Sequence, residues 1–381
     1  MASIFLDTTA SPAGSVSSGA KKTRIFLDCD TGIDDALAIL FLLASPQADL
    51  IGLAGIFGNV QADQAARNSR QLLDCLDRQD IPVYQGASQP SFWNDDPARS
   101  GRPYSVDPGC TRFHGDNGLG GAVLPVSSSA DINQKVTGAE AIAQAVRRYG
   151  KEVTILATGP LTDVDLALQS DPSLASDMKL VLMGGTLTQP GNCYDLVCET
   201  NIINDPEAAN RVFHSGADIT MVGLDVTHQC LMTRSQMNAI KALDTSLAQF
   251  VYEMTDYYIS ANEASDPIFA QGSPLHDPLA AAVALDPSLI RTFPINLRVE
   301  IQTGDGYGVR GRTIGDPTML GAFFSQSADV PTHSPRTRVA LGVDSRRFVD
   351  LWYSRLKFIC SRDYPQTDYL VHKSSSISHR A

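Results

Sequence analysis

The sequence predicts an α/β protein, a single domain with a mostly parallel, doubly wound central sheet and a small antiparallel extension. Between residues 24 and 222, short apolar runs alternate with longer segments of helical character. This alternation is typical of a parallel sheet with helices on both faces. After residue 295, strand-like stretches follow one another without a helix between them, which favours an antiparallel addition. No stretch has the composition of a linker, so we expect one domain.

The strand and helix nearest the start of the chain have the clearest sequence patterns. The apolar run Ile25, Phe26 and Leu27 predicts a buried strand over 24–29. Gly32 allows a turn, and the helix formers after it predict a helix over 33–44. The same reasoning predicts strands at 50–57, 81–84, 153–157, 179–183, 219–222, 295–302, 307–312 and 337–341. It predicts helices at 62–78, 138–149, 161–169, 206–214, 234–263, 277–285 and 345–359.

The two ends of the chain differ in composition from its middle. Residues 1–23 are rich in Ala, Ser, Thr and Gly, lack the apolar run of a signal peptide, and are expected to be a disordered extension. The main domain is expected over 24–362, with a frayed tail over 363–381. Residues 87–130 read as a long loop, which in a compact domain is usually functional or mobile.

Composition excludes several classes of function. The 381 residues carry a net charge of −12, which argues against a nucleic-acid partner because such proteins need a basic footprint. No segment approaches the apolar length of a membrane span, so no membrane partner is expected. The 7 cysteines are an odd number and do not form a disulfide framework, which indicates reduced thiols and a cytoplasmic protein.

Four acidic residues cluster where the first strand passes into the first helix: Asp28, Asp30, Asp34 and Asp35. In open α/β sheets, ligands bind outside the carboxyl ends of the strands. Acids packed together repel one another, and a hard cation such as calcium or magnesium relieves that repulsion. Helix capping explains one or two of the four acids, so the cluster favours a metal site.

The spacing Asp-x-Asp-x-x-x-Asp-Asp resembles the signature of the nucleoside hydrolases, the calcium-dependent inosine/uridine-preferring N-ribohydrolases. Further segments resemble the same family in the same order, from about residue 24 to about residue 360. They are Gly58-Asn59, His114-Gly115, the stretch 157–162, the stretch 181–185, Asn192, the stretch 199–201, the stretch 205–209 and the stretch 276–278. The resemblance implies a catalytic domain that cleaves ribonucleosides to ribose and free base.

The resemblance also implies a calcium site. Its ligands would be the carboxylates of Asp30, Asp35 and Asp277 and the backbone carbonyl of Thr158. Asp30 would take a proton from the attacking water, and the anomeric carbon would be inverted, as in related glycoside hydrolysis. Asp277 precedes Pro278 and also suits a helix cap, and both roles can hold together.

The ribose contacts are likewise carried over from the resemblance. Asp34 and Asn201 would bind the 2′- and 3′-hydroxyls, and Asn192 and Glu199 the 5′-hydroxyl, with Asn59 near the metal and ribose. A site built around these hydroxyls would reject 2′-deoxy substrates. Turn residues are the alternative for Asn59 and Asn192, and the segment between Asn192 and Glu199 is one residue longer than in the family pattern.

Two histidines are assigned to the base. His276 resembles the general acid that protonates the departing base, and His114 resembles a base contact on a mobile loop. An exposed loop histidine is the alternative for His114. Tyr257, Tyr258 and Phe269 are candidates for aromatic contacts, although aromatic residues at this spacing are also typical of a core. The resemblance implies uridine and inosine as substrates, and a homodimer or homotetramer.

Two other functions remain open. The run 28–31 is similar to the Asp-x-Asp of haloacid-dehalogenase-type phosphatases, but Gly32 stands where that pattern has Thr or Val. The phosphatase pattern also does not account for Asp34, Asp35 and the pair His276-Asp277. A catalytically silent nucleoside-binding protein is the second alternative, and the presence of every expected metal ligand argues against it.

Overall fold

The structure is a computed structural model that describes residues 21–95, 97, 99–124, 131–193, 196–315, 337–362 and 364. The extension expected over 1–23 and the tail expected over 363–381 therefore lie outside the described residues, apart from 21–23 and 364.

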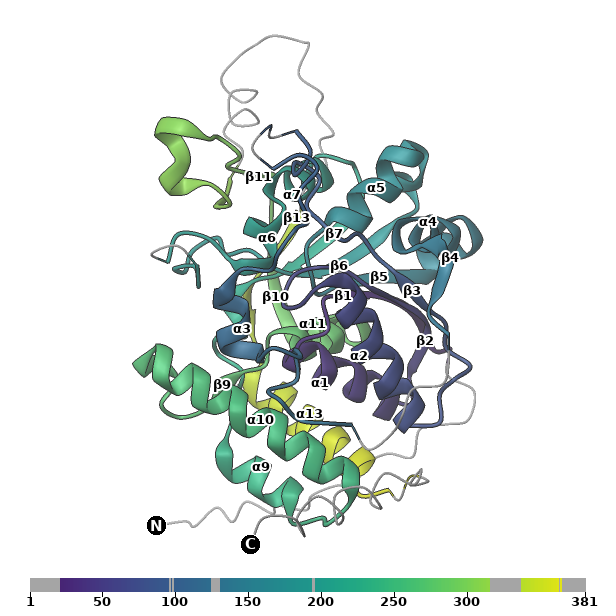
Figure 1. Cartoon of the computed structure of the whole chain (residues 1–381), viewed down its shortest axis with the longest axis vertical. Coiled ribbons are helices and arrows are strands. Elements are labelled where there is room, and N and C mark those ends of the chain that lie inside the picture. Colours follow the sequence, from purple (N-terminus) through teal and green to yellow (C-terminus); the bar gives the residue numbers. More distant parts are fainter. Residues whose placement is uncertain are drawn as a thin grey trace, which may run out of the picture.

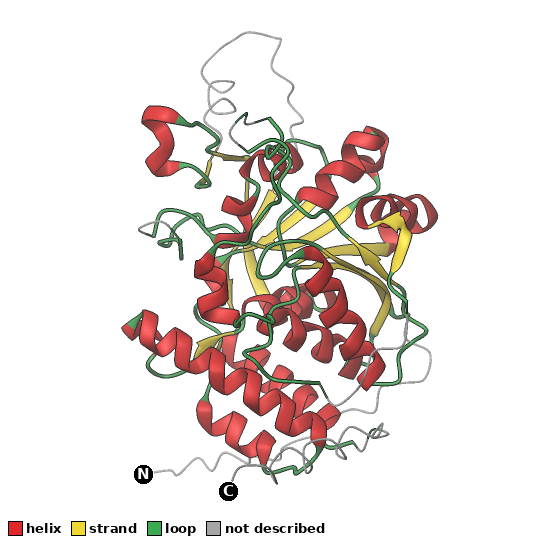
Figure 2. Ribbon diagram, in the orientation of Figure 1, coloured by secondary structure: helices red, strands yellow, loops and turns green. Residues whose placement is uncertain are grey.

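A nine-stranded sheet forms the centre of the molecule, in the order β10-β13-β7-β6-β5-β1-β2-β3-β4 (Figures 1 and 2). Every neighbouring pair is parallel except β10 with β13, which confirms the predicted fold class. The strands are β1 (Thr23–Cys29), β2 (Ala48–Gly55), β3 (Val83–Gln85), β4 (Asn133–Thr137), β5 (Val153–Ala157), β6 (Lys179–Met183), β7 (Asp218–Val222), β10 (Ile290–Ile295) and β13 (Thr337–Val343).

The direction in which the chain builds the sheet reverses beside β1. Strands β2, β3 and β4 extend the sheet on one side of β1, and β5, β6 and β7 extend it on the other. Such a reversal opens a crevice at the carboxyl ends of the two strands concerned. The passage from β1 into α1 and the loop after β5 lie at this point, and they carry the acid cluster and Thr158.

Helices cover both faces of the sheet (Figures 1 and 2). One face packs against α1 (Ile33–Ala44), α2 (Ala62–Cys75), α10 (Ser246–Ser265), α11 (His276–Leu285) and α13 (Ser345–Cys360). The other face packs against α4 (Gly138–Tyr149), α5 (Thr162–Ser170) and α7 (Pro206–Phe213). Nearly every residue of α1 is buried, including its two acids, so the first helix is a core element that brings charge into the interior.

Several boundaries differ from the sequence prediction. The helix predicted over 234–263 is two helices, α9 (Arg234–Lys241) and α10, because Asp244 has a φ of 56° and Thr245 caps the second helix. The strand predicted over 307–312 is wrong, since a 3-10 segment (Gly304–Val309) occupies this part of the chain. Antiparallel pairing instead joins β11 (Leu297–Val299) to β12 (Thr313–Gly315), and β8 (Leu231–Met232) to β9 (Ser273–Pro274).

The long segment expected as a loop over 87–130 contains a helix, α3 (Pro108–His114). Asp107 caps this helix by accepting a hydrogen bond from Gly109 N, and Pro108 follows the cap, where its missing N–H is not needed. Two further short helices, α6 (Thr200–Asn204) and α8 (Leu224–Thr227), were also not predicted. In the described part of the chain, no helix is long and apolar enough to cross a membrane.

Candidate active site

A cavity of about 380 Å³ opens at the carboxyl edge of the sheet. Its walls come from the first turn of α1, from the loops after β2 and β5, from α6 and the segment before it, and from helices α3, α10 and α11. Nine of the residues predicted from the sequence line it: Asp34, Asn59, His114, Thr158, Asn192, Glu199, Asn201, His276 and Asp277. The two others, Asp30 and Asp35, are fully buried and within reach of residues on the cavity wall.

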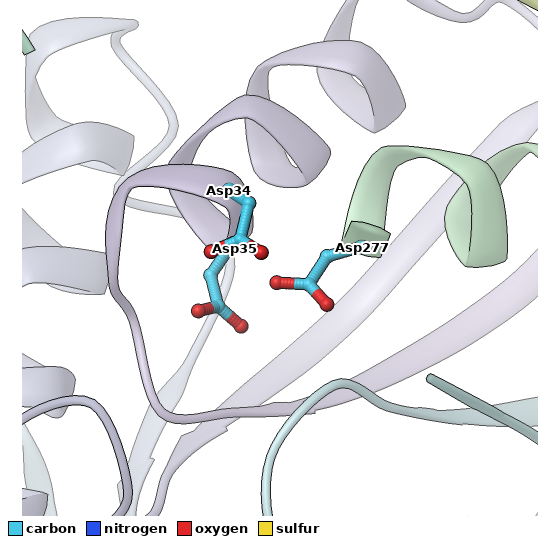
Figure 3. Close-up of side chains that lie close together, drawn as sticks. All are labelled: Asp34, Asp35 and Asp277. Atoms are coloured by element: carbon cyan, nitrogen blue, oxygen red, sulfur yellow. The ribbon is translucent and has the colours of Figure 1, made fainter. Parts of the chain in front are cut away.

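Three carboxylates, of which two line the cavity, converge on one another (Figure 3). Asp34 and Asp35 lie in the first turn of α1 and Asp277 in the first turn of α11, and each offers an oxygen within 4.8 Å of the others. Helix N-termini favour negative charge, which explains why two helices can present acids here. The close group contains Asp34 in place of Asp30, which was expected as a ligand from the sequence.

Asp30 is fully buried, and Asn59 fixes the position of its carboxyl group. Its Oδ2 accepts a hydrogen bond of 2.7 Å from the backbone N of Asn59, and its Oδ1 accepts one of 3.0 Å from Asn59 Nδ2. Gly58 makes this approach possible, since a Cβ at that position would lie 1.9 Å from Asp30 Oδ2. Asn59 is therefore more than a turn residue: it orients the predicted base.

Asp35 links the cluster to the end of β5. It accepts hydrogen bonds from Thr158 Oγ1 (2.7 Å) and from the backbone N of Gly32 (2.9 Å). The carbonyl of Thr158, the expected backbone ligand, accepts a hydrogen bond of 2.8 Å from Asn201 Nδ2 and keeps its second lone pair.

The electrostatics of this cluster indicate a bound cation. Burial, followed by the neighbouring acids, raises the pKa of Asp30 and Asp277 well above the usual range and that of Asp34 to about 7. Asp30 pairs with Asp35, and Asp34 with Asp277, through side-chain contacts that need a shared proton. One oxygen of Asp34 is buried without any hydrogen-bond donor. Among the described residues no Lys or Arg lines the cavity, so a cation suits this set of oxygens.

Polar groups for a sugar lie on one side of the cavity. Glu199 caps α6 and accepts hydrogen bonds from the backbone N atoms of Gly185 (2.8 Å), Asn201 (2.9 Å) and Ile202 (3.1 Å). Burial raises the pKa of Glu199 despite these donors. The exposed Asn192 accepts hydrogen bonds from Thr200 N and Oγ1, both at 3.1 Å.

Histidine and aromatic rings form the other side. His114 is buried, its ring centroid lies 5.4 Å from that of Tyr258, and its Nδ1 accepts a hydrogen bond of 3.1 Å from Ile33 N. Nδ1 is thus an acceptor, and burial lowers the pKa of His114 to about 3, so the ring is neutral with its proton on Nε2. The exposed-loop alternative for His114 is wrong.

His276 lies beside Asp277 with its Nδ1 2.8 Å from the hydroxyl of Thr227. Burial, followed by the neighbouring His228 and His114, lowers the pKa of His276 well below its usual value. The hydroxyl of Thr227 therefore orients a neutral imidazole in the cavity wall.

His228 is the main wall residue that the sequence analysis missed. Its ring lies 5.6 Å from that of His276 and 5.2 Å from that of Phe269. The available signal was position, because His228 follows β7 at the same sheet edge as the acids. Of the three aromatic candidates, Tyr258 and Phe269 line the cavity, whereas the hydroxyl of Tyr257 donates instead to backbone carbonyls of α3.

Comparison of the sequence and the structure with known proteins finds similarity to nucleoside hydrolases. The family model described as inosine-uridine preferring nucleoside hydrolase matches residues 25–350. A pyrimidine-specific ribonucleoside hydrolase, RihA of Escherichia coli O7:K1, is 36% identical over 335 residues, which cover 88% of this chain and 98% of that protein.

Solved structures of similar proteins have the same fold. The purine-preferring ribonucleoside hydrolase of Gardnerella vaginalis is 38% identical with a TM-score of 0.78, over 89% of this chain and 99% of that one. A plant nucleoside hydrolase, PpNRh1, is 30% identical with a TM-score of 0.76, over 88% of this chain and 99% of that one. Because the family model spans residues 25–350 and a relative of 36% identity covers 88% of the chain, the chain belongs to the inosine-uridine preferring family of nucleoside hydrolases and is a ribonucleoside hydrolase.

Proposed function

We propose that this enzyme is calcium-dependent, that Asp30 activates the attacking water, and that the anomeric carbon is inverted. The observation that carries the proposal is the convergence of buried acids, hydroxyl-binding side chains and histidines on one cavity. The products are ribose and a free base, which suits nucleoside salvage.

The residues that would hold the cation are Asp30, Asp35 and Asp277 through their carboxylates and Thr158 through its carbonyl. Asp34 belongs to the tightest group of acids and stands close enough to contribute. A bound divalent ion supplies a lowered pKa and a fixed orientation for a water molecule. Oxygen ligands of this kind suit calcium or magnesium, and calcium tolerates the less regular arrangement.

Asp30 is the base in this proposal. Both of its oxygens accept hydrogen bonds from Asn59, which fixes the carboxylate in one orientation. A proton taken from water on the face opposite the leaving base gives inversion. The remaining carboxylates stabilise the positive charge that develops on the ribose.

Asp34 and Asn201 are proposed to bind the 2′- and 3′-hydroxyls. Asn201 uses its Nδ2 on the carbonyls of Thr158 and Met183, so its Oδ1 is the atom for a substrate hydroxyl. Asn192 and Glu199 are proposed for the 5′-hydroxyl. Removal of the 2′-hydroxyl would leave buried polar groups unpaired and lower the reaction rate steeply.

His276 is proposed to donate the proton that the departing base needs, with Thr227 holding the ring. Because the ring is neutral in the free site, it must take up a proton before it acts as this acid. His114, protonated on Nε2, offers a donor to the base, and Tyr258 and Phe269 offer apolar surface. Uridine and inosine are the proposed substrates. The relatives include one pyrimidine-specific and one purine-preferring enzyme, so the ranking of bases is part of the test.

We propose a cytoplasmic homodimer or homotetramer as well. All seven cysteines are free thiols, which suits a reducing compartment. Light scattering on the purified protein measures the assembly directly.

The decisive experiment measures reducing sugar released from uridine, inosine, adenosine and cytidine, with and without chelator treatment. Release that stops with chelator and returns with calcium supports the proposal, and Asp30→Ala should abolish it. Wild-type activity in Asp30→Ala would overturn the proposed mechanism. Binding without release would support a silent binder, and phosphate release from nucleotides would support a phosphatase.

A further inference from the structure

Two cysteines pair across the segment that carries the proposed 5′-hydroxyl contacts. Cys193 and Cys198 form an antiparallel bridge, and the backbone N of Cys193 donates a hydrogen bond of 3.0 Å to the carbonyl of Cys198. Asn192 directly precedes the first cysteine and Glu199 directly follows the second. The residues on either side of this bridge, Asn192 and Glu199, therefore both line the cavity.

The backbone geometry of this pair permits a disulfide. Opposed residues of antiparallel strands have Cα atoms about 4.5–5.5 Å apart, and a disulfide needs about 4.4–6.8 Å. Burial, followed by the Cys193 thiol, raises the pKa of Cys198 to about 12, so Cys193 lies close enough to act on Cys198 electrostatically. Both are free thiols in the structure.

Access to the two thiols is unequal. Cys193 is half-buried and lines the cavity, whereas Cys198 is fully buried. A reagent from solvent therefore meets Cys193 first and leaves Cys198 to resolve the reaction. We infer that Cys193 and Cys198 are a reversible disulfide pair whose oxidation joins the two sides of this bridge and fixes the separation of Asn192 and Glu199.

The oxidant required is a small-molecule disulfide such as oxidised glutathione. The Cys193 thiolate attacks one sulfur of that disulfide, forms a mixed disulfide and releases one glutathione thiolate. The Cys198 thiolate then attacks Cys193 Sγ and releases the second. Two electrons pass to glutathione and each cysteine loses its proton. Burial raises the pKa of Cys193 to about 11, so the reaction should be slow at neutral pH and accelerate as pH rises.

The expected effect on the enzyme follows from the residues that flank the two cysteines. Asn192 precedes Cys193 and Glu199 follows Cys198, so a cross-link holds these two residues at a fixed separation before substrate binds. Such preorganisation strengthens binding. This functional consequence rests on the proposed assignment of Asn192 and Glu199 to the 5′-hydroxyl.

The experiment equilibrates the full-length protein in glutathione buffers of increasing oxidation, blocks the remaining thiols and maps cross-linked peptides by mass spectrometry. We expect a peptide that joins Cys193 to Cys198, reversed by dithiothreitol and missing in Cys193→Ser and Cys198→Ser. Cys110→Ser is the matched control, because Cys110 also lines the cavity and should leave the cross-link intact. A cross-link from Cys193 to Cys110 overturns the inference. So does a protein in which Cys193 and Cys198 stay reduced in the most oxidised glutathione buffers.

The kinetic arm compares oxidised and reduced enzyme. We expect oxidation to lower the KM for uridine or inosine about two- to fivefold and to leave the KM for the 5′-deoxy analogue unchanged. A formed cross-link with an unchanged KM for both substrates overturns the proposed role of the pair. The peptide map needs no turnover, so an enzyme inactive on every ribonucleoside would contradict the proposed function without affecting the thiol result.

Discussion

The buried carboxyl groups of Asp28 and Asp163 lie close enough to each other to share a proton. Asp28 belongs to β1 and Asp163 to the first turn of α5. Among the described residues, no N–H or O–H group donates to either oxygen of Asp28 or to Oδ2 of Asp163, so one of the two carboxyls must supply the proton. Gly86 and Gly138 make room for this contact, since a Cβ on either would lie within 2.5 Å of Asp163 Oδ2.

This pair should make the protein less stable as pH rises. Burial raises the pKa of Asp163 to about 7 from its ordinary value of 3.8. Between these values the folded state holds more protons than the unfolded state, so the free energy of unfolding falls with increasing pH. Asp163→Asn should reduce this fall, because an amide donates to Asp28 without titrating while its oxygen still accepts from Ala87 N. Part of the fall should remain, because burial still raises the pKa of Asp28.

We expect Asp163→Asn to be more stable than the wild type by about 1–3 kcal/mol near pH 8 and to lose this advantage near pH 4. Urea unfolding across this pH range measures the difference. Asp177→Asn is the control, because Asp177 is exposed and its replacement should change nothing. An Asp163→Asn variant that is destabilised equally at every pH would show that the pair is not a titrating one.

The Asp28–Asp163 pair also marks the limit of reasoning from the sequence. The strand–turn–helix over 24–44 was predicted correctly because an apolar run, a glycine and good helix formers all agree locally. The partner of Asp28 comes from α5, and no local pattern connects two such distant segments. The edge strand β10 was missed for another reason: four of its six residues are exposed and it contains Pro294, so it lacks the apolar run of a buried strand.

The residues of the candidate active site were likewise predicted only in part. Residues within recognisable motifs, such as Asp34 and Asp277, were predicted from the sequence and line the cavity. His228 belongs to no recognisable motif and was therefore missed. Tyr257 and Tyr258 are adjacent in sequence, so only the orientation of their helix shows that Tyr258 lines the cavity and that Tyr257 donates hydrogen bonds to α3.

Removal of one carboxylate should remove the response to metal. A ligand that binds only the folded state adds about 2.7 kcal/mol at a hundredfold excess over its Kd. Wild-type protein should therefore show a Tm that rises by several degrees with calcium and falls after chelation. Asp277→Asn should be more stable than the wild type without calcium, because one buried charge is lost, and should not respond to calcium. A calcium response in Asp277→Asn equal to that of the wild type would remove this residue from the ligand set.

Gly32 should be required for a functional site because of a close approach. A Cβ at Gly32 would lie 2.5 Å from His114 Nδ1 and 2.7 Å from Asn59 Nδ2. Gly32→Ala should displace both side chains and lower kcat/KM about 10- to 100-fold, since small misplacements in an active site have effects of this size. Gly308→Ala is the control, because a Cβ there meets nothing within 4 Å. A normal kcat/KM in Gly32→Ala would mean that neither side chain needs its present position.

His276→Ala should slow hydrolysis only of those substrates whose leaving group needs a proton to depart. A purine or uracil base departs with difficulty unless it is protonated, whereas nitrophenolate departs unaided. If His276 is the acid, its loss should lower kcat on inosine or uridine about 10²- to 10⁴-fold and leave nitrophenyl riboside hydrolysis within a few-fold of wild type. His214→Ala, at an exposed histidine, should change neither rate. Equal losses on both substrates would instead indicate that His276 acts by positioning Asp277, its neighbour in the first turn of α11.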